Sequence, residues 1–279
     1  MRAASLLIRT KDEAKRLGAA LEAVFWQDLR PHEVFVIDSG STDATLDIAA
    51  RYPVRILHIA PSDWGYSRAL NLAASHATGE ILVCLSAHSV PADRQWLTRL
   101  LRHFDDPRIA AVWGASVAPG GVLPSGPAVS QESAAYTFAT RRWGMSNQNS
   151  ALRRALWAEF PFDESMPAAE DKRWAQEAMA RGYRVVYDPT AAVWHDWHSP
   201  RNAFRRNRAV SEGYKMMFPE LASSPVLRRV TRAVWRELRL IARKRRVDRF
   251  WGVVRRSPSK LSAVFGDAVG VRRGGSRER

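Results

Sequence analysis

The chain has 279 residues, of which 46% are hydrophobic, and a formal net charge of +15. This composition predicts a folded protein with one sizeable core and excludes a largely disordered chain. Cys84 is the single cysteine, which excludes an intramolecular disulfide and favours a reducing, cytoplasmic setting. No apolar run approaches the roughly 20 residues of a membrane-spanning helix, and the N-terminal apolar stretch is too short for a signal peptide. We therefore expect a protein that is not integral to a membrane.

The positive charge is concentrated near the C-terminus. Residues 200–279 contain 22 of the 43 Lys and Arg residues but only 6 of the 28 Asp and Glu residues, which leaves residues 1–199 close to neutral. This change in composition predicts two parts: a catalytic domain over residues 1–199 and a basic helical extension over residues 200–279. A basic segment of this kind should seek polyanions. We expect its end, residues 270–279, to be disordered.

The first part of the chain alternates between strand and helix patterns. Such alternation predicts an α/β fold with a mostly parallel central sheet flanked by helices. The segment RTKDEAKRLG after the first strand lacks the G-x-G-x-x-G pattern, which argues against a dinucleotide-binding fold. Strands are expected at 5–10, 33–38, 54–60 and 80–85, and helices at 13–27, within 39–52 and at 67–79, the last ended by Gly79.

Polar residues stand where the first two strands end. Thr10 and Asp12 follow the first strand, and Asp38 closes the second. The carboxyl ends of strands form the ligand crevice of open α/β sheets, so Asp38 could accept hydrogen bonds from a nucleoside. Alternatively, Asp38 and Asp43 only satisfy backbone donors of the turn and of the next helix.

Several segments together resemble, in order and spacing, the inverting glycosyltransferases of family 2 with the GT-A fold. The resemblance covers residues 4 to about 198. It implies a nucleotide-sugar donor bound by the first half and a hydroxyl acceptor bound by the second half. The segments that carry it are IRTKDE, IDSGSTDAT, YSRALN, ATGEILVCLSAH, AAEDKRWAQEAMARGY and AVWHDWH.

The loop after the fourth strand departs from the family pattern. The family usually carries Asp-x-Asp there, whose carboxylates hold a divalent metal and the ribose, whereas this chain has Ser86, Ala87 and His88. Imidazole suits Mn²⁺ better than Mg²⁺, which relies on carboxylates and phosphates. We expect either a softer metal held by His88, the diphosphate and a second histidine, or metal-independent catalysis by protonated His88 with Arg68. His88 could also be an ordinary loop residue.

Residues 146–189 read as a polar loop, a short helix over 151–157, a second helix ended by Gly182, and a strand. Glu170 and Asp171 begin the second helix, where a carboxylate is stabilised by the helix dipole. An ionised carboxylate could also serve as general base for an acceptor hydroxyl. The resemblance favours catalysis, because its Glu-Asp pair matches Glu170 and Asp171, the aspartate being the usual base. It also implies that Asn147 and Asn149 line the donor-sugar or acceptor pocket, unless they cap the short helix.

Two histidines follow the last predicted strand, three residues apart. The resemblance matches His195 to a histidine that completes the metal or diphosphate shell, whereas His198 matches less well. Either residue could instead be a packed, hydrogen-bonded histidine. A structural zinc site is disfavoured, because the chain has one cysteine and no suitable cluster.

The basic tail alternates apolar residues with arginine at helical spacing. We expect it to bind an anionic membrane surface near a saccharide or lipid-linked acceptor, although it could simply pack on the catalytic domain. A nucleic-acid-binding protein is the rival from another class, but no recognised module appears and no specific nucleic acid is expected. A nucleotidyltransferase is the rival enzyme. The sequence does not define the sugar, the nucleobase, the acceptor or the oligomeric state.

Overall fold

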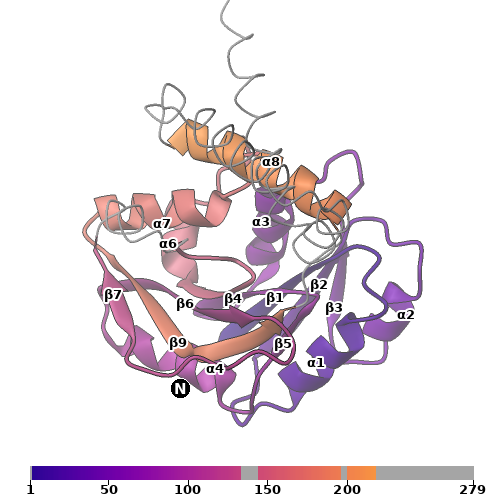
Figure 1. Cartoon of the computed structure of the whole chain (residues 1–279), viewed down its shortest axis with the longest axis horizontal. Coiled ribbons are helices and arrows are strands. Elements are labelled where there is room, and N and C mark those ends of the chain that lie inside the picture. The colour runs from indigo at the N-terminus through magenta and orange to yellow at the C-terminus, as the bar shows by residue number, and fades with distance from the viewer. Residues whose placement is uncertain (1, 133–143, 196–199, 218–279) are drawn as a thin grey trace, which may run out of the picture. The chain divides into compact units, whose positions relative to one another are not determined.

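The computed structural model describes residues 2–132, 144–195 and 200–217, with side chains in the last segment from residue 208 onward (Figure 1). These residues divide into two compact units. One contains the chain up to Glu164 together with the segment that begins at Glu170, and the other contains Ser165–Ala169 and the helix α8 (Pro200–Met217). Each unit is described by itself below.

The first unit is built on one sheet in the order β3-β2-β1-β4-β8-β6-β9-β5, with β7 paired to β9. The strands from β3 to β4 are parallel, as expected from the strand–helix alternation. The other half is mixed, because β8 runs antiparallel to both β4 and β6. The strands are β1 (Ala4–Thr10), β2 (Glu33–Asp38), β3 (Arg55–His58), β4 (Ile81–Ser86), β5 (Ser89–Pro91), β6 (Ile109–Val117), β7 (Val129–Gln131), β8 (Asn149–Arg153) and β9 (Arg184–His195).

Helices cover both faces of this sheet (Figure 1). Successive residues of a strand face opposite sides, so Leu6 and Ile8 of β1 join a core under α1 and α4, whereas Leu7 joins a second core under α3, α6 and α7. The predicted α/β class with flanking helices is therefore confirmed. The helices are α1 (Leu17–Phe25), α2 (Thr45–Ala49), α3 (Tyr66–His76), α4 (Trp96–Leu101), the 3-10 turn η1 (Arg102–Asp105), α6 (Arg154–Glu159) and α7 (Glu170–Ala180).

Two local predictions were wrong. Helix α3 ends at His76 and not at Gly79; a Cβ atom at Gly79 would lie 2.8 Å from the backbone nitrogen of Ser5, so glycine permits close packing against β1. Residues 149–153 form the buried strand β8, whereas the sequence predicted a helix over 151–157. The hydrogen-bond ladders to β4 and β6 outweigh the helical propensity of this segment, and α6 begins only at Arg154.

The second unit places α8 at the start of the basic extension, where a helix was predicted. Within this unit, Met217 packs with Met166 and Ala169. A Cβ atom at Gly213 would lie 2.2 Å from the carbonyl oxygen of Ala168, so glycine is needed at this contact. Across the residues that the structure describes, no helix is both long and apolar enough to cross a membrane. His198 and residues 218–279, which form the rest of the predicted basic extension and include its end at 270–279, lie outside the described residues.

Candidate functional site

The carboxyl ends of three neighbouring strands meet at one edge of the sheet. Thr10 ends β1 and pairs with Asp38 at the end of β2, while Arg9 pairs with Ser86 at the end of β4. Thr10, Asp38 and Ser86 are buried, and the Thr10 hydroxyl has no hydrogen-bond partner among the described residues. Buried polar atoms normally have a partner, and ligands of open α/β sheets bind at this edge. The structure thus brings these three residues together where a donor was expected.

Asp12 and Asp38 use their carboxylates within the loops that follow β1 and β2. Asp38 accepts hydrogen bonds from the backbone nitrogen atoms of Gly40 (2.9 Å) and Ser41 (3.0 Å). Asp12 accepts one from the backbone nitrogen of Thr42 (2.7 Å), and its own backbone nitrogen donates to Ser41 Oγ (2.9 Å). Asp38 therefore satisfies turn donors, which was the alternative to nucleoside binding, and Asp12 joins the two loops.

His88 is held by Glu13, which the sequence did not single out. The two side chains are 12% and 9% exposed, and His88 Nδ1 lies 2.9 Å from Glu13 Oε1. An ionised carboxylate only accepts hydrogen bonds, so Nδ1 carries the proton in this contact. Arg16 Nη1 lies 3.8 Å from the other carboxylate oxygen of Glu13. His88 is therefore an oriented imidazole.

His195 lies beside His88. It is the last residue of β9, is fully buried, and pairs in register with Ser89 of β5. Its Nδ1 lies 2.9 Å from Ser89 Oγ, and its ring centroid lies 4.7 Å from that of His88. The sheet therefore brings together the two histidines that the sequence assigned to one site, although 107 positions separate their numbers in the chain.

The residue types at this histidine pair bear on the choice of metal. Within the described ranges, no group of three or more His, Cys, Asp or Glu side chains is placed to hold a metal ion. A divalent ion would therefore take His88 and His195 as protein ligands and need substrate oxygen atoms to complete its shell. Two imidazoles fit Mn²⁺ or another transition ion better than Mg²⁺, which prefers carboxylates and water.

Glu170 and Asp171 begin α7 and are both buried, with exposures of 3% and 8%. Glu170 Oε1 lies 3.3 Å from Arg9 Nη1. Asp171 accepts hydrogen bonds from the backbone nitrogen of Asn147 (3.0 Å) and from Lys172 Nζ (3.3 Å). Burial, and then the neighbouring Asp171 carboxylate, raises the pKa of Glu170. Asp171 is thus the more exposed acid of the pair, and it accepts hydrogen bonds from several donors.

Arg9 connects the acid pair to the strand-end edge. It precedes Thr10 in β1, and its guanidinium donates to the carbonyl oxygen of Tyr66 (3.2 Å) while lying 5.0 Å from the Tyr66 ring centroid. The same nitrogen contacts Glu170. One partly buried cation therefore links β1, α3 and α7, which places the two acids next to the end of β1.

The two asparagines predicted to line a pocket have different surroundings. Asn149 is fully buried, and its side chain donates to the carbonyl oxygen atoms of Ala115 (3.0 Å) and Ala191 (2.8 Å) and accepts from Trp96 Nε1 (2.8 Å). These contacts give Asn149 a role inside the sheet. Asn147 lies by the acids, with its Nδ2 3.4 Å from Glu170 Oε1. Neither caps a helix over 151–157, because that segment begins as β8.

Arg68 lies in the first turn of α3, and its side chain is 49% exposed. Its guanidinium contacts Glu164 (3.2 Å) and the carbonyl oxygen of Asp63 (3.2 Å). The described contacts therefore give Arg68 an acidic partner on the protein and none with His88. A role at the donor diphosphate requires exchange of Glu164 for phosphate.

Sequence reasoning missed the partners of the predicted residues. Glu13, Arg9 and Lys172 each contact a predicted site residue: His88, Glu170 and Asp171, respectively. Arg9 and Glu13 belong to the segment IRTKDE, and Lys172 to AAEDKRW, so all three lie in motifs that carried the resemblance. The signal that could have identified them in the sequence was a charged residue next to a strand end or a helix start.

Comparisons with known proteins find relatives among the glycosyltransferases. The O-antigen chain rhamnosyltransferase RfbN of Salmonella typhimurium is 29% identical over 217 residues, covering 72% of this chain and 69% of the relative. The O-antigen chain rhamnosyltransferase WbaN of Salmonella anatum is 27% identical over 194 residues, covering 64% and 62%. The matched parts therefore leave about a third of each relative outside the comparison.

Solved structures show the same fold at low sequence identity. The mannosyltransferase PcManGT of Pyrobaculum calidifontis, in complex with GDP-Man and Mn²⁺, has a TM-score of 0.68 at 17% identity, covering 100% of this chain and 88% of that one. TarS of S. aureus has a TM-score of 0.58 at 18% identity, with coverage of 76% and 65%. The family model "Glycosyl transferase family 2" matches residues 5–158. The chain belongs to glycosyl transferase family 2, with the GT-A fold.

Proposed function

We propose that this glycosyltransferase moves a sugar from a nucleotide-sugar donor to a hydroxyl group of a saccharide or lipid-linked acceptor, with inversion, in the synthesis of a cell-surface polysaccharide or glycolipid. One observation carries the proposal: Arg9 links the end of β1, where a donor would bind, to the buried pair Glu170–Asp171. The names of the two Salmonella relatives support a polysaccharide product.

In this proposal Asp171 is the general base. A single inverting displacement needs a carboxylate that removes the proton of the acceptor hydroxyl as that oxygen attacks the sugar. Asp171 is the more exposed acid and is held at the start of α7, where the helix dipole favours negative charge. Glu170, fixed by Arg9 and Asn147, orients the acceptor side.

The donor side consists of the residues at the strand ends. Thr10 and Ser86 would bind the nucleotide, with Asp12 and Asp38 shaping the loops or contacting the nucleoside. Arg68 would bind diphosphate in exchange for Glu164. The buried Thr10 hydroxyl, which has no hydrogen-bond partner among the described residues, supports the proposal of a ligand at this edge.

His88 faces the leaving diphosphate in place of the family's Asp-x-Asp. The Ser-Ala-His segment could neutralise that group by an imidazolium, or through a divalent ion held with His195 and substrate oxygen atoms. Such an ion would supply positive charge to the leaving group when bound. The two-imidazole donor set predicts that any ion required will be Mn²⁺ in preference to Mg²⁺.

The function is tested by replacing the base. Asp171→Asn should preserve donor binding and lower kcat by about 10² to 10⁴, the usual contribution of a positioned proton acceptor. Glu170→Gln is the matched control and should have a smaller effect. Nucleotide-sugar panels, beginning with rhamnosyl donors because of the Salmonella relatives, provide the assay. Near-normal turnover by Asp171→Asn would reject the assignment, and inorganic pyrophosphate release from a nucleoside triphosphate would favour a nucleotidyltransferase.

Metal dependence is a separate test of the His88 site. After chelation, Mn²⁺ should restore donor binding or turnover more effectively than Mg²⁺, unless activity persists without either ion. Both results agree with a site that lacks the two acids of Asp-x-Asp. Strict dependence on Mg²⁺ would contradict the proposed ligand set.

We also propose that the basic extension holds the enzyme at the cytoplasmic face of an anionic membrane. Each Lys or Arg near such a surface contributes about 1 kcal/mol, and residues 200–279 contain 22 of them. The full chain should cosediment with anionic vesicles and poorly with neutral ones, and salt should weaken the binding. Removal of residues 221–279 should abolish it. Salt-sensitive binding to DNA or RNA without binding to vesicles would favour the nucleic-acid alternative.

A further inference from the structure

Glu13 and His88 form a partly buried contact between two loops that the sequence separates by 75 positions. His88 follows β4, whereas Glu13 follows β1, the neighbouring strand of the sheet. The loop after β4 itself has no acid at the two positions where the family usually has Asp-x-Asp. A carboxylate nevertheless lies at this place, 2.9 Å from the His88 ring, and it comes from a different strand.

The backbone around Glu13 is fixed. The preceding residue, Asp12, has φ +52°, a left-handed conformation that turns the chain sharply and that aspartate tolerates better than most residues. The backbone nitrogen of Glu13 donates to Thr45 Oγ1 (2.8 Å), and its carbonyl oxygen accepts from Arg16 and Leu17 at the start of α1. The position of the Glu13 backbone is therefore set by β1 and by the first turns of α1 and α2.

The contact determines which ring nitrogen of His88 serves a ligand. A carboxylate that accepts from Nδ1–H fixes the ring orientation and leaves Nε2 as the nitrogen that serves as ligand or donor on the opposite edge of the ring. Second partners of this kind commonly orient histidines that bind metals, and their removal typically lowers metal affinity or activity by 10- to 100-fold. Ser89 makes the corresponding contact to Nδ1 of His195, so both imidazoles of the pair are held through the same nitrogen.

We infer that Glu13 is a positioning residue for the donor diphosphate: it holds His88 so that Nε2 serves this group. The Ser-Ala-His segment has no acid of its own. Glu13, in the loop after β1, supplies one, and it acts on the ligand through His88 and not by direct contact. This inference rests on the proposed function, because it assumes that His88 meets a nucleoside diphosphate. A purely structural Glu13–His88 pair would stabilise the fold without affecting ligand affinity.

The test is a double-mutant cycle on nucleotide affinity. UDP, GDP and dTDP are screened by thermal shift with the unchanged full chain, and the one that raises Tm most is used as the probe. Its Kd is then measured by calorimetry, with and without Mn²⁺, for Glu13→Ala, Glu13→Gln, His88→Ala and the double variant Glu13→Ala/His88→Ala. Glu22→Gln, an exposed position on α1, is the matched control.

Glu13→Ala should weaken the Kd roughly tenfold, the lower end for loss of such a partner. Glu13→Gln keeps an acceptor for Nδ1–H and should lose less, and Glu22→Gln should bind normally. In the His88→Ala background, Glu13→Ala should have no further effect on Kd, because interacting residues are not additive. An unchanged Kd in Glu13→Gln and Glu13→Ala, or full additivity in the double variant, would overturn the inference while leaving the proposed function intact. Absence of binding by all three nucleotides to the unchanged chain would overturn the proposed function, and this inference with it.

Discussion

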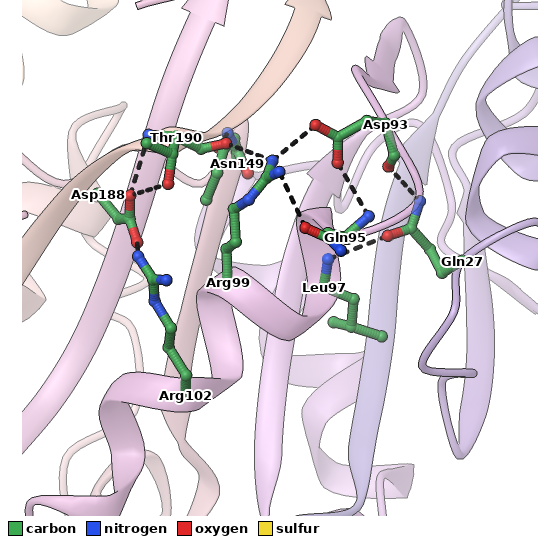
Figure 2. Close-up of polar contacts among 10 residues, drawn as sticks. Gln27, Asp93, Gln95, Leu97, Arg99, Arg102, Asn149, Asp188 and Thr190 are labelled. Atoms are coloured by element: carbon green, nitrogen blue, oxygen red, sulfur yellow. Dashed lines mark hydrogen bonds and ion pairs between the residues drawn. The ribbon is translucent and has the colours of Figure 1, made fainter. Parts of the chain in front are cut away.

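Asn149 offers a direct test of whether a predicted pocket residue instead supports the fold. Its side chain makes three buried hydrogen bonds, which join β8 to α4, β6 and β9 through Trp96, Ala115 and Ala191. Figure 2 shows Asn149 next to the polar network that runs from Gln27 to Arg102 beside α4. Asn149→Ala would leave one buried donor and two buried acceptor carbonyls without this partner.

Leaving a buried polar group unsatisfied costs about 1 to 3 kcal/mol, so three such groups predict a loss of roughly 3 kcal/mol or more in the free energy of unfolding. That is a large part of the 5 to 15 kcal/mol typical of a folded protein. Asn147→Ala is the matched control. Its side chain accepts from Ser150 Oγ (3.0 Å) and donates to Glu170 Oε1 (3.4 Å), so by the same reasoning its loss should cost roughly 2 kcal/mol, less than the loss of Asn149. Its larger effect should be on kcat/KM.

Urea denaturation followed by circular dichroism measures the stability difference, and transfer kinetics measure the functional one. If Asn149→Ala is too unstable to purify, Trp96→Phe removes the indole N–H together with part of the buried ring, and it should cost roughly 2 kcal/mol or more. The reasoning would be refuted if Asn149→Ala unfolded at the urea concentration of the unchanged protein while its KM for the acceptor rose. That result would support the original prediction that Asn149 lines the acceptor pocket.

Two further predictions concern titration. Burial opposes ionisation of Asp188, but hydrogen bonds from His103, Thr190 and Arg102 outweigh it and lower its pKa from 3.8 to about 2. Its stabilisation, roughly 2 kcal/mol, is therefore complete above about pH 4 and is lost as the pH falls towards 2. Urea midpoints between pH 2 and 6 should show this loss, and an equally steep loss in Asp188→Asn would contradict it. Burial raises the pKa of Cys84 to about 12, so mass spectrometry should find alkylation by iodoacetamide at pH 8 only after unfolding; rapid reaction of the folded protein would contradict this.

The parallel half of the sheet could be predicted because its signals are local. β1, β2 and β4 are short, buried, mainly apolar runs, β3 is a more exposed edge strand, and a helix pattern follows each of β1, β2 and β3. The antiparallel strand β8 could not be predicted in this way. Its sequence NSALR continues into RALWAE with good helix formers, and only its pairing with β4 and β6 makes it extended. Those partners lie far away in the sequence.

In the candidate site, too, some residues could be placed from the sequence and others could not. Thr10, Asp38 and Ser86 could be placed from the sequence because strand ends of a parallel sheet share one edge. Their bonding partners could not be placed, since a side-chain contact depends on loop geometry as well as sheet order. The Glu13–His88 contact illustrates this, because it needs the left-handed turn at Asp12 that no spacing rule reveals.

Both sides of the site depend on β1. The Arg9 side chain extends from this strand towards one core and contacts Glu170. Glu13, just after the end of the strand, contacts His88. The strand and the loop after it thus place the cation Arg9 beside the acid pair, and the acid Glu13 beside the histidine pair. Because β1 lies inside the sheet between β2 and β4, it is held on both edges and can fix the two partners relative to each other. Two of the charged residues of IRTKDE, Arg9 and Glu13, therefore pair with Glu170 and His88, which lie far away in the sequence.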